Sequence, residues 1–187
     1  MSSETDISGD AMTTSPLAVL FVCKGNHARS IMAEAIMRRM AGKFAVYSAG
    51  SQPRASINPF VVRLLKSLNH DVSDLRPKSW DGFSGPNAPQ LDFVFTLSET
   101  AANAVPPAWP GNPVTALWTL PDPAAYEGDD VQKALAFADA YRMLNNRISL
   151  FASLPLATLK GMALQHRLDA IGKDTSRADP LQRDDAA

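Results

Sequence analysis

Residues 17–30 read LAVLFVCKGNHARS, and they are the part of the sequence most informative about the fold. Its first six residues form a continuous apolar run, which is typical of a parallel strand that is covered on both faces. Cys23 ends that run, a short polar loop follows, and residues 29–40 repeat apolar side chains at helical spacing. The stretch therefore predicts a strand, a tight loop and a helix in immediate succession.

The sequence outside this stretch continues the alternation of strands and helices. We expect further strands at residues 44–48, 91–97 and 114–118. Further helices are expected from residue 59, from 130 to about 151, and after Pro155 to about 171. Residues 76–90 are rich in proline and glycine and predict a long loop or short turns. Because such alternation forms right-handed crossovers, we predict an α/β fold of three layers: about four parallel strands with helices on both faces.

Length and composition limit the class of protein. A chain of 187 residues with 45% hydrophobic residues suits one globular domain, which we place at residues 17–172. Residues 1–16 and 173–187 are polar without periodicity, so we predict two disordered tails. A net charge of −1 argues against a nucleic-acid partner or a membrane surface. With one cysteine, no secretory signal and no long apolar segment, we expect a cytoplasmic protein without an internal disulfide.

The loop after the first strand has the residue types of an oxyanion site with a nucleophile. Loop N–H groups and the positive end of a helix dipole favour an anion, and Arg29 can donate two hydrogen bonds to it. Gly25 and Asn26 tolerate the left-handed backbone that such a loop needs. The same positive field favours Cys23 as a thiolate, and Ser30 can donate its hydroxyl to the sulfur. The predicted loop residues are Cys23, Lys24, Gly25, Asn26, His27, Ala28, Arg29 and Ser30.

Each of these residues also has an interpretation without a role in binding or catalysis. A free cysteine is most often a small buried apolar residue. Lys24 and His27 either add positive charge near the anion or face solvent. His70 and His166 have no neighbouring ligands in the sequence, so we predict no metal site.

The pattern Cys-X5-Arg-Ser after a first strand resembles the low-molecular-weight protein tyrosine phosphatase superfamily, over residues 17–172. Within it the chain is most similar to the bacterial arsenate reductase branch. The resemblance implies a doubly wound sheet of order 2-1-3-4, the phosphatase I-like fold. It also implies that Asp122 is the general acid and that Ser48 and Asn26 hold the loop. The matching motifs are Val19–Cys23, Gly25-Asn26, Ala33-Glu34, Tyr47–Ser51 and Pro121–Ala125.

Asp122 also stands out without the resemblance. It follows the fourth predicted strand, so it belongs to the same sheet edge as Cys23. A carboxylic acid there can protonate a leaving oxygen and then deprotonate the attacking water. The alternative is that the Asp-Pro pair only shapes a turn.

The sequence departs from both branches of the superfamily. Reductases with an internal disulfide relay need further cysteines, and residues 97–99 and 105–107 supply none. The aromatic pair of the tyrosine phosphatases is replaced by Ala124-Ala125, with Tyr126 beyond. The tryptophans that could form an aromatic wall, or pack in the core instead, are Trp80, Trp109 and Trp118.

Three functions follow, all without a bound cofactor. The first in rank is hydrolysis of phosphomonoesters, as in phosphotyrosine phosphatases, through a phosphocysteine at Cys23; its substrate is a phosphorylated protein or a small oxyanion compound. The alternative is arsenate reduction with an external thiol, such as glutathione with glutaredoxin, or thioredoxin. The third is a non-catalytic oxyanion-binding module.

Overall fold

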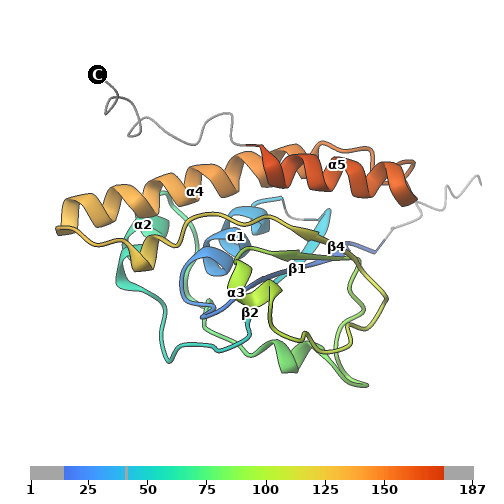
Figure 1. The fold of residues 1–187 in the computed structure, drawn as a ribbon, viewed down its shortest axis with the longest axis horizontal. Coiled ribbons are helices and arrows are strands. Elements are labelled where there is room, and N and C mark those ends of the chain that lie inside the picture. The colour runs from blue at the N-terminus through green and yellow to red at the C-terminus, as the bar shows by residue number, and fades with distance from the viewer. Residues whose placement is uncertain (1–14, 41, 175–187) are drawn as a thin grey trace, which may run out of the picture.

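The computed structural model describes residues 15–40 and 42–174 (Figure 1). Its centre is a sheet of four parallel strands in the spatial order β2-β1-β3-β4. This confirms the α/β sheet and its order, while the predicted tails fall almost wholly outside the described residues. The strands are β1 (Leu17–Cys23), β2 (Phe44–Gly50), β3 (Phe93–Thr96) and β4 (Val114–Leu117).

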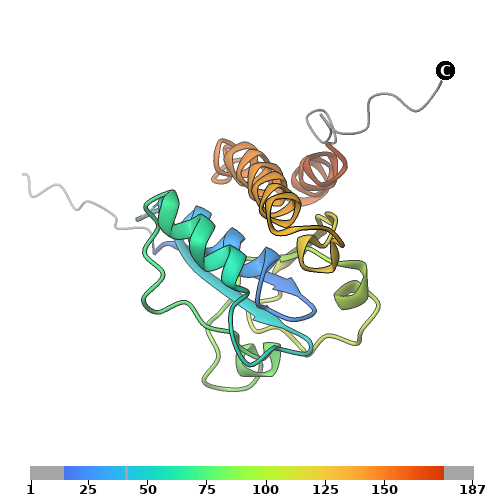
Figure 2. The same ribbon diagram turned by 90° about the vertical axis from the view of Figure 1, so that its left-hand side faces the viewer.

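Four helices cover one face of the sheet (Figure 2). They are α1 (Arg29–Arg38), α2 (Pro59–Ser67), α4 (Asp130–Ala152) and α5 (Gly161–Lys173). Polar side chains begin two of them, as helix N-termini favour. Asn58 accepts a hydrogen bond from the N–H of Phe60, and Asp129 forms a capping box with Gln132. All four predicted helices are present, with ends shifted by a few residues.

Shorter elements cover the opposite face. These are the 3-10 helix η1 (Trp80–Phe83) and the single-turn helix α3 (Glu99–Ala102), together with the loops around them. Among the described residues, long helices cover only the first face of the sheet. The proline- and glycine-rich segment at 76–90 crosses the second face without forming a long helix. A further turn, η2 (Pro123–Ala125), follows Asp122.

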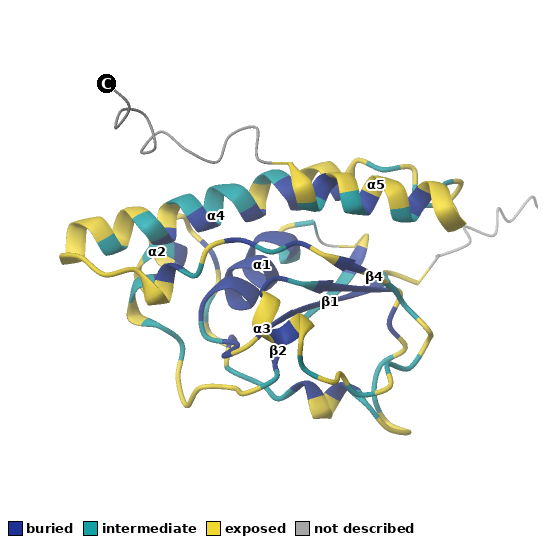
Figure 3. Ribbon diagram, viewed as in Figure 1, coloured by how far each residue is buried: buried dark blue, intermediate teal, exposed yellow. Residues whose placement is uncertain are grey.

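Alternate side chains of the central strand pack on opposite faces of the sheet. Val19 and Phe21 face the four helices, whereas Leu20 and Val22 face η1 and α3. Helix α1 is buried along almost its whole length, while α4 and α5 keep exposed outer faces (Figure 3). Within the described residues no helix is long and apolar enough to cross a membrane. This packing fixes β1 and α1, and with them the loop that joins the two elements.

Candidate active site

The segment after β2 holds the backbone of the loop. The carbonyls of Cys23, Lys24, Gly25 and His27 accept hydrogen bonds of 3.2, 2.8, 2.9 and 2.9 Å from the N–H groups of residues 51, 52, 54 and 58. In the described part of the chain, the N–H groups of residues 25–28 meet no acceptor. The loop therefore offers unpaired backbone donors at the start of α1, as an anion site requires.

Cys23 lies at the carboxyl end of β1, with 2% of its surface exposed. Its Sγ lies 2.9 Å from the Oγ of Ser30, in the first turn of α1. That contact allows the hydroxyl to donate to a thiolate. Cys23 borders the apolar core and also lines a cavity, so burial and access to a ligand coexist at this residue.

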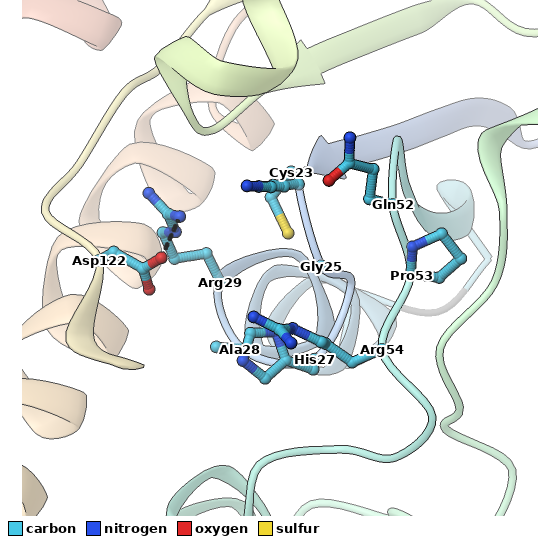
Figure 4. Close-up of a pocket in the computed structure, with 10 residues that line it drawn as sticks. Cys23, Gly25, His27, Ala28, Arg29, Gln52, Pro53, Arg54 and Asp122 are labelled. Carbon is cyan, nitrogen blue, oxygen red and sulfur yellow. Dashed lines mark hydrogen bonds and ion pairs between the residues drawn. The ribbon is translucent and has the colours of Figure 1, made fainter. Parts of the chain in front are cut away.

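The cavity has a volume of about 280 Å³ and lies in front of the loop (Figure 4). The loop, Asp122 and the segment after β2 line it together. Among the described lining residues, His27 alone carries an aromatic ring and basic side chains predominate, so the cavity suits a small anion. The lining residues are Cys23, Lys24, Gly25, His27, Ala28, Arg29, Gln52, Pro53, Arg54 and Asp122.

Arg29 and Asp122, far apart in the sequence, form an ion pair on one wall. The distance from Arg29 Nη2 to Asp122 Oδ2 is 2.7 Å, and Nη1 donates to the carbonyl of Leu120 at 3.0 Å. The Nε of Arg29 is buried without an acceptor in the described residues. Because an unpaired buried donor is costly, this N–H is well suited to a ligand oxygen.

Asn26 joins the loop to its surroundings from a left-handed backbone, with φ of 42°. Its Nδ2 donates to the hydroxyls of Ser30 and Ser48, each at 2.8 Å. Its Oδ1 accepts from the N–H of Lys78 at 2.7 Å. The structure thus brings together Asn26, Ser30 and Ser48, and their role in holding the loop for catalysis stays a prediction.

A buried carboxylate supports this network. Glu34 is 1% exposed and accepts a hydrogen bond from the Ser48 hydroxyl. It also pairs with Lys78 at 3.1 Å and with Arg38 at 2.6 Å. The sequence analysis named Glu34 within a matching motif but gave it no role in the site, and it missed Lys78. The available signal was an acid that stands alone among the apolar residues 31–37 of the first predicted helix.

The structure corrects the prediction for the backbone of Gly25 and limits the positive charge that His27 can supply. Gly25 does not adopt a left-handed backbone; instead, a Cβ there would lie 2.5 Å from His27 Nδ1, so glycine is needed for this close approach. His27 does not supply a full positive charge at pH 7, because burial lowers its pKa below 6.5. Asp122 raises this pKa, while Arg54 and Arg29 lower it further.

The tryptophans lie away from the cavity. Trp118 is fully buried and stacks on Phe95 with ring centroids 3.9 Å apart. Trp80 and Trp109 contact each other on the opposite face of the sheet. Tyr126 borders a separate groove beside Asp122. These rings therefore form no aromatic wall around the oxyanion cavity.

The segment after β2 contributes lining residues that sequence reasoning missed. Gln52, Pro53 and Arg54 reach the cavity because their backbone runs along the loop. They match no motif, and nothing in the spacing of the sequence places them beside Cys23.

Comparison with known families and sequences confirms the resemblance. The model of the low molecular weight phosphotyrosine protein phosphatase family matches residues 18–162. An arsenate reductase of Halalkalibacterium halodurans is 34% identical over 135 residues, which are 72% of this chain and 94% of that protein. A glutaredoxin arsenate reductase of Synechocystis is 33% identical over 106 residues, 56% of this chain and 77% of that protein.

Solved structures agree with the sequence comparisons. An arsenate reductase in the phosphate-binding state superposes with a TM-score of 0.58 at 27% identity, covering 71% of this chain and 94% of the other. The tyrosine phosphatase Wzb from Escherichia coli K30, solved with sulphate, gives a TM-score of 0.55 at 19% identity, covering 72% and 95%. The second likeness concerns the fold alone.

Proposed function

The chain belongs to the low molecular weight phosphotyrosine protein phosphatase family, and we propose that within it the chain is an arsenate reductase that depends on an external thiol. The observation that carries this proposal is the cavity, which pairs one thiol with an oxyanion loop and lacks an aromatic wall for a phenyl ring among its described residues. The similarity to proteins named arsenate reductase supports the same choice. The proposal reverses the ranking that the sequence alone favoured, in which hydrolysis came first.

The first step joins arsenate to the enzyme. The Cys23 thiolate attacks arsenic, an S–As bond forms, and one hydroxyl of arsenate leaves as water. The loop N–H groups and Arg29 Nε hold the remaining oxygens. Asp122, ionised in its pair with Arg29, can take a proton from the bound arsenate and pass it to the departing hydroxyl, since its carboxyl group lies at the cavity wall. Arsenic stays pentavalent in this step.

The second step needs a sulfur that this chain does not contain, because Cys23 is its one cysteine. An external thiol attacks the sulfur of Cys23, and the S–As bond breaks with its electron pair remaining on arsenic. Arsenite leaves, and Cys23 is oxidised to a mixed disulfide with the thiol. A second thiol then regenerates Cys23 and carries away the disulfide. Glutaredoxin is a candidate for this last reduction, by analogy with the Synechocystis relative.

The test is arsenite production by the purified chain with glutathione alone, with glutathione and glutaredoxin, and with thioredoxin. We expect turnover with glutathione that increases when glutaredoxin is added, and none in Cys23→Ser. Failure of wild type to reduce arsenate with any of these thiols would contradict the proposal.

Hydrolysis of phosphomonoesters is the second candidate, favoured by Asp122 at the cavity wall and by chemistry that needs no reductant. The same preparation is therefore assayed with p-nitrophenyl phosphate. Hydrolysis without arsenate reduction would place this candidate first. Absence of both activities, with phosphate still bound, would indicate an oxyanion-binding module.

A further inference from the structure

Positive charge remains around the cavity after Arg29 and Asp122 have paired with each other. Asp122 is the one carboxylate among the described lining residues, and Arg29 already pairs with it at 2.7 Å. Lys24 and Arg54 line the same cavity, and within residues 15–40 and 42–174 neither has an ion-pair partner. The charges of these two side chains are therefore available to a ligand.

Arg54 is anchored beside the loop. Its backbone N–H donates to the carbonyl of Gly25 at 2.9 Å. Its Cγ would lie 3.3 Å from a Cβ placed on Gly25, so the side-chain stem rests on the loop. Figure 4 shows the Arg54 side chain reaching from the segment that carries Pro53 across His27. The guanidinium thus borders the cavity beside His27, and the contact with the loop is made by the stem of the side chain.

A tetrahedral oxyanion does not need these two charges. The unpaired N–H groups of residues 25–28 and the free Nε of Arg29 already offer it donors. A second anionic group, close to the oxyanion but separate from it, would be matched by Arg54 and Lys24. Guanidinium groups favour carboxylates in particular, because two parallel N–H groups fit two oxygens.

We propose that Arg54, assisted by Lys24, binds a carboxylate of the external thiol and thereby brings its sulfur to Cys23. This inference rests on the proposed arsenate reduction, and it names the class of co-substrate: a small thiol that carries a carboxylate, such as glutathione. The positive charges of Arg54 and Lys24 also favour the thiolate form of the incoming sulfur, which is the form that attacks. Arg54 is thus a specificity residue for the second substrate.

The kinetic test compares two thiols in arsenate reduction. Glutathione carries carboxylates, whereas 2-mercaptoethanol carries none. In Arg54→Gln we expect the KM for glutathione to increase about tenfold or more, as for loss of a charge-assisted pair, with a much smaller change for 2-mercaptoethanol. The KM for arsenate should change little. Arg167→Gln, which replaces an exposed arginine on α5, is the matched control and should behave as wild type.

Esterified glutathione completes the comparison. For wild type, the KM for glutathione diethyl ester should exceed the KM for glutathione by the same factor of about ten or more. Arg54→Gln should discriminate little between the two thiols, because the pair is already broken. An equal loss on esterification in wild type and in Arg54→Gln would overturn the proposal.

A binding measurement separates this inference from the reaction. S-methylglutathione cannot reduce arsenate, and its binding to Cys23→Ser with phosphate present is measured by calorimetry. We expect binding that Arg54→Gln weakens and Arg167→Gln does not, even if wild type proves not to reduce arsenate. Undetectable binding, or binding unaffected by Arg54→Gln, would overturn the inference while leaving arsenate reduction intact. An increase in the KM for arsenate alone would show that Arg54 only attracts the oxyanion, which also overturns it.

Discussion

Replacing Asn26 by alanine removes three hydrogen bonds at once and leaves the N–H of Lys78 without its acceptor, while Ser30 and Ser48 keep their contacts with Cys23 and Glu34. The lost contacts are those to Ser30, to Ser48 and from the N–H of Lys78, at 2.8, 2.8 and 2.7 Å. Each contributes about 1 kcal/mol to the free energy of unfolding. Alanine tolerates the left-handed backbone at a φ of 42° poorly, which costs about 1–2 kcal/mol more. We expect Asn26→Ala to be destabilised by about 4–5 kcal/mol, a large part of the usual stability of a domain.

Asn26→Gly separates the two contributions. Glycine loses the same hydrogen bonds but tolerates the left-handed backbone, so it should be more stable than Asn26→Ala by about 1–2 kcal/mol. Urea unfolding of wild type and both variants measures the difference, provided that the m-values agree. Asn69, at a φ of 57° outside the site, is the matched position, and Asn69→Gly should change stability little. An Asn26→Ala variant within about 1 kcal/mol of wild type, or a glycine variant less stable than alanine, would refute this account of the loop.

Four other changes test the site and its supports. Arg29→Lys keeps the positive charge but loses the Nε donor and the paired N–H groups of the guanidinium. The kcat for arsenate reduction should therefore fall about 100- to 1,000-fold, a larger change than the increase in KM. Arg147→Met removes donors to the carbonyls of Trp118 and Thr119, which lead to Asp122, and should lower the free energy of unfolding by about 2 kcal/mol in urea titrations. Burial lowers the pKa of His27 and of His70, so the unfolded chain binds more protons than the folded chain near pH 6. The melting temperature should therefore fall as the pH decreases below about 6.5. The fall should be smaller in His70→Gln than in His166→Gln, which replaces an exposed histidine and serves as the control. Ser98→Cys supplies a second sulfur, and in single-turnover assays without external thiol it should release arsenite, whereas stoichiometric release by wild type would contradict the two-step reaction.

The loop was predictable because local sequence determines most of it. An apolar strand, a polar turn and a helix in succession place Cys23 and Arg29 at one sheet edge whatever the rest of the chain does. The ion pair of Arg29 with Asp122 needed the strand order, which the resemblance supplied and the structure confirms. The general-acid role of Asp122 remains a prediction.

Contacts made by residues without a local pattern could not be predicted. Arg54 reaches the cavity only because its backbone bonds to the carbonyl of Gly25, a contact set by how the chain leaves β2. Glycine at position 25 has a steric cause, the His27 ring, that a propensity for left-handed backbone does not reveal. Helices as short as α3 contain too few residues for a helical period, so hydrophobic periodicity does not detect them.

The end of β3 bears on the proposal that the reducing sulfur comes from an external thiol. The N–H of Leu97 donates to the carbonyl of Val22 at 2.8 Å, so the chain after β3 passes beside Cys23. The next residue, Ser98, is 3% exposed, and its hydroxyl accepts from the N–H of Ala101 as the N-cap of α3. At this neighbouring position the chain thus uses a helix-capping hydroxyl rather than a thiol. In the proposed reaction the second sulfur therefore reaches Cys23 through the cavity, which the unpaired charge of Arg54 lines.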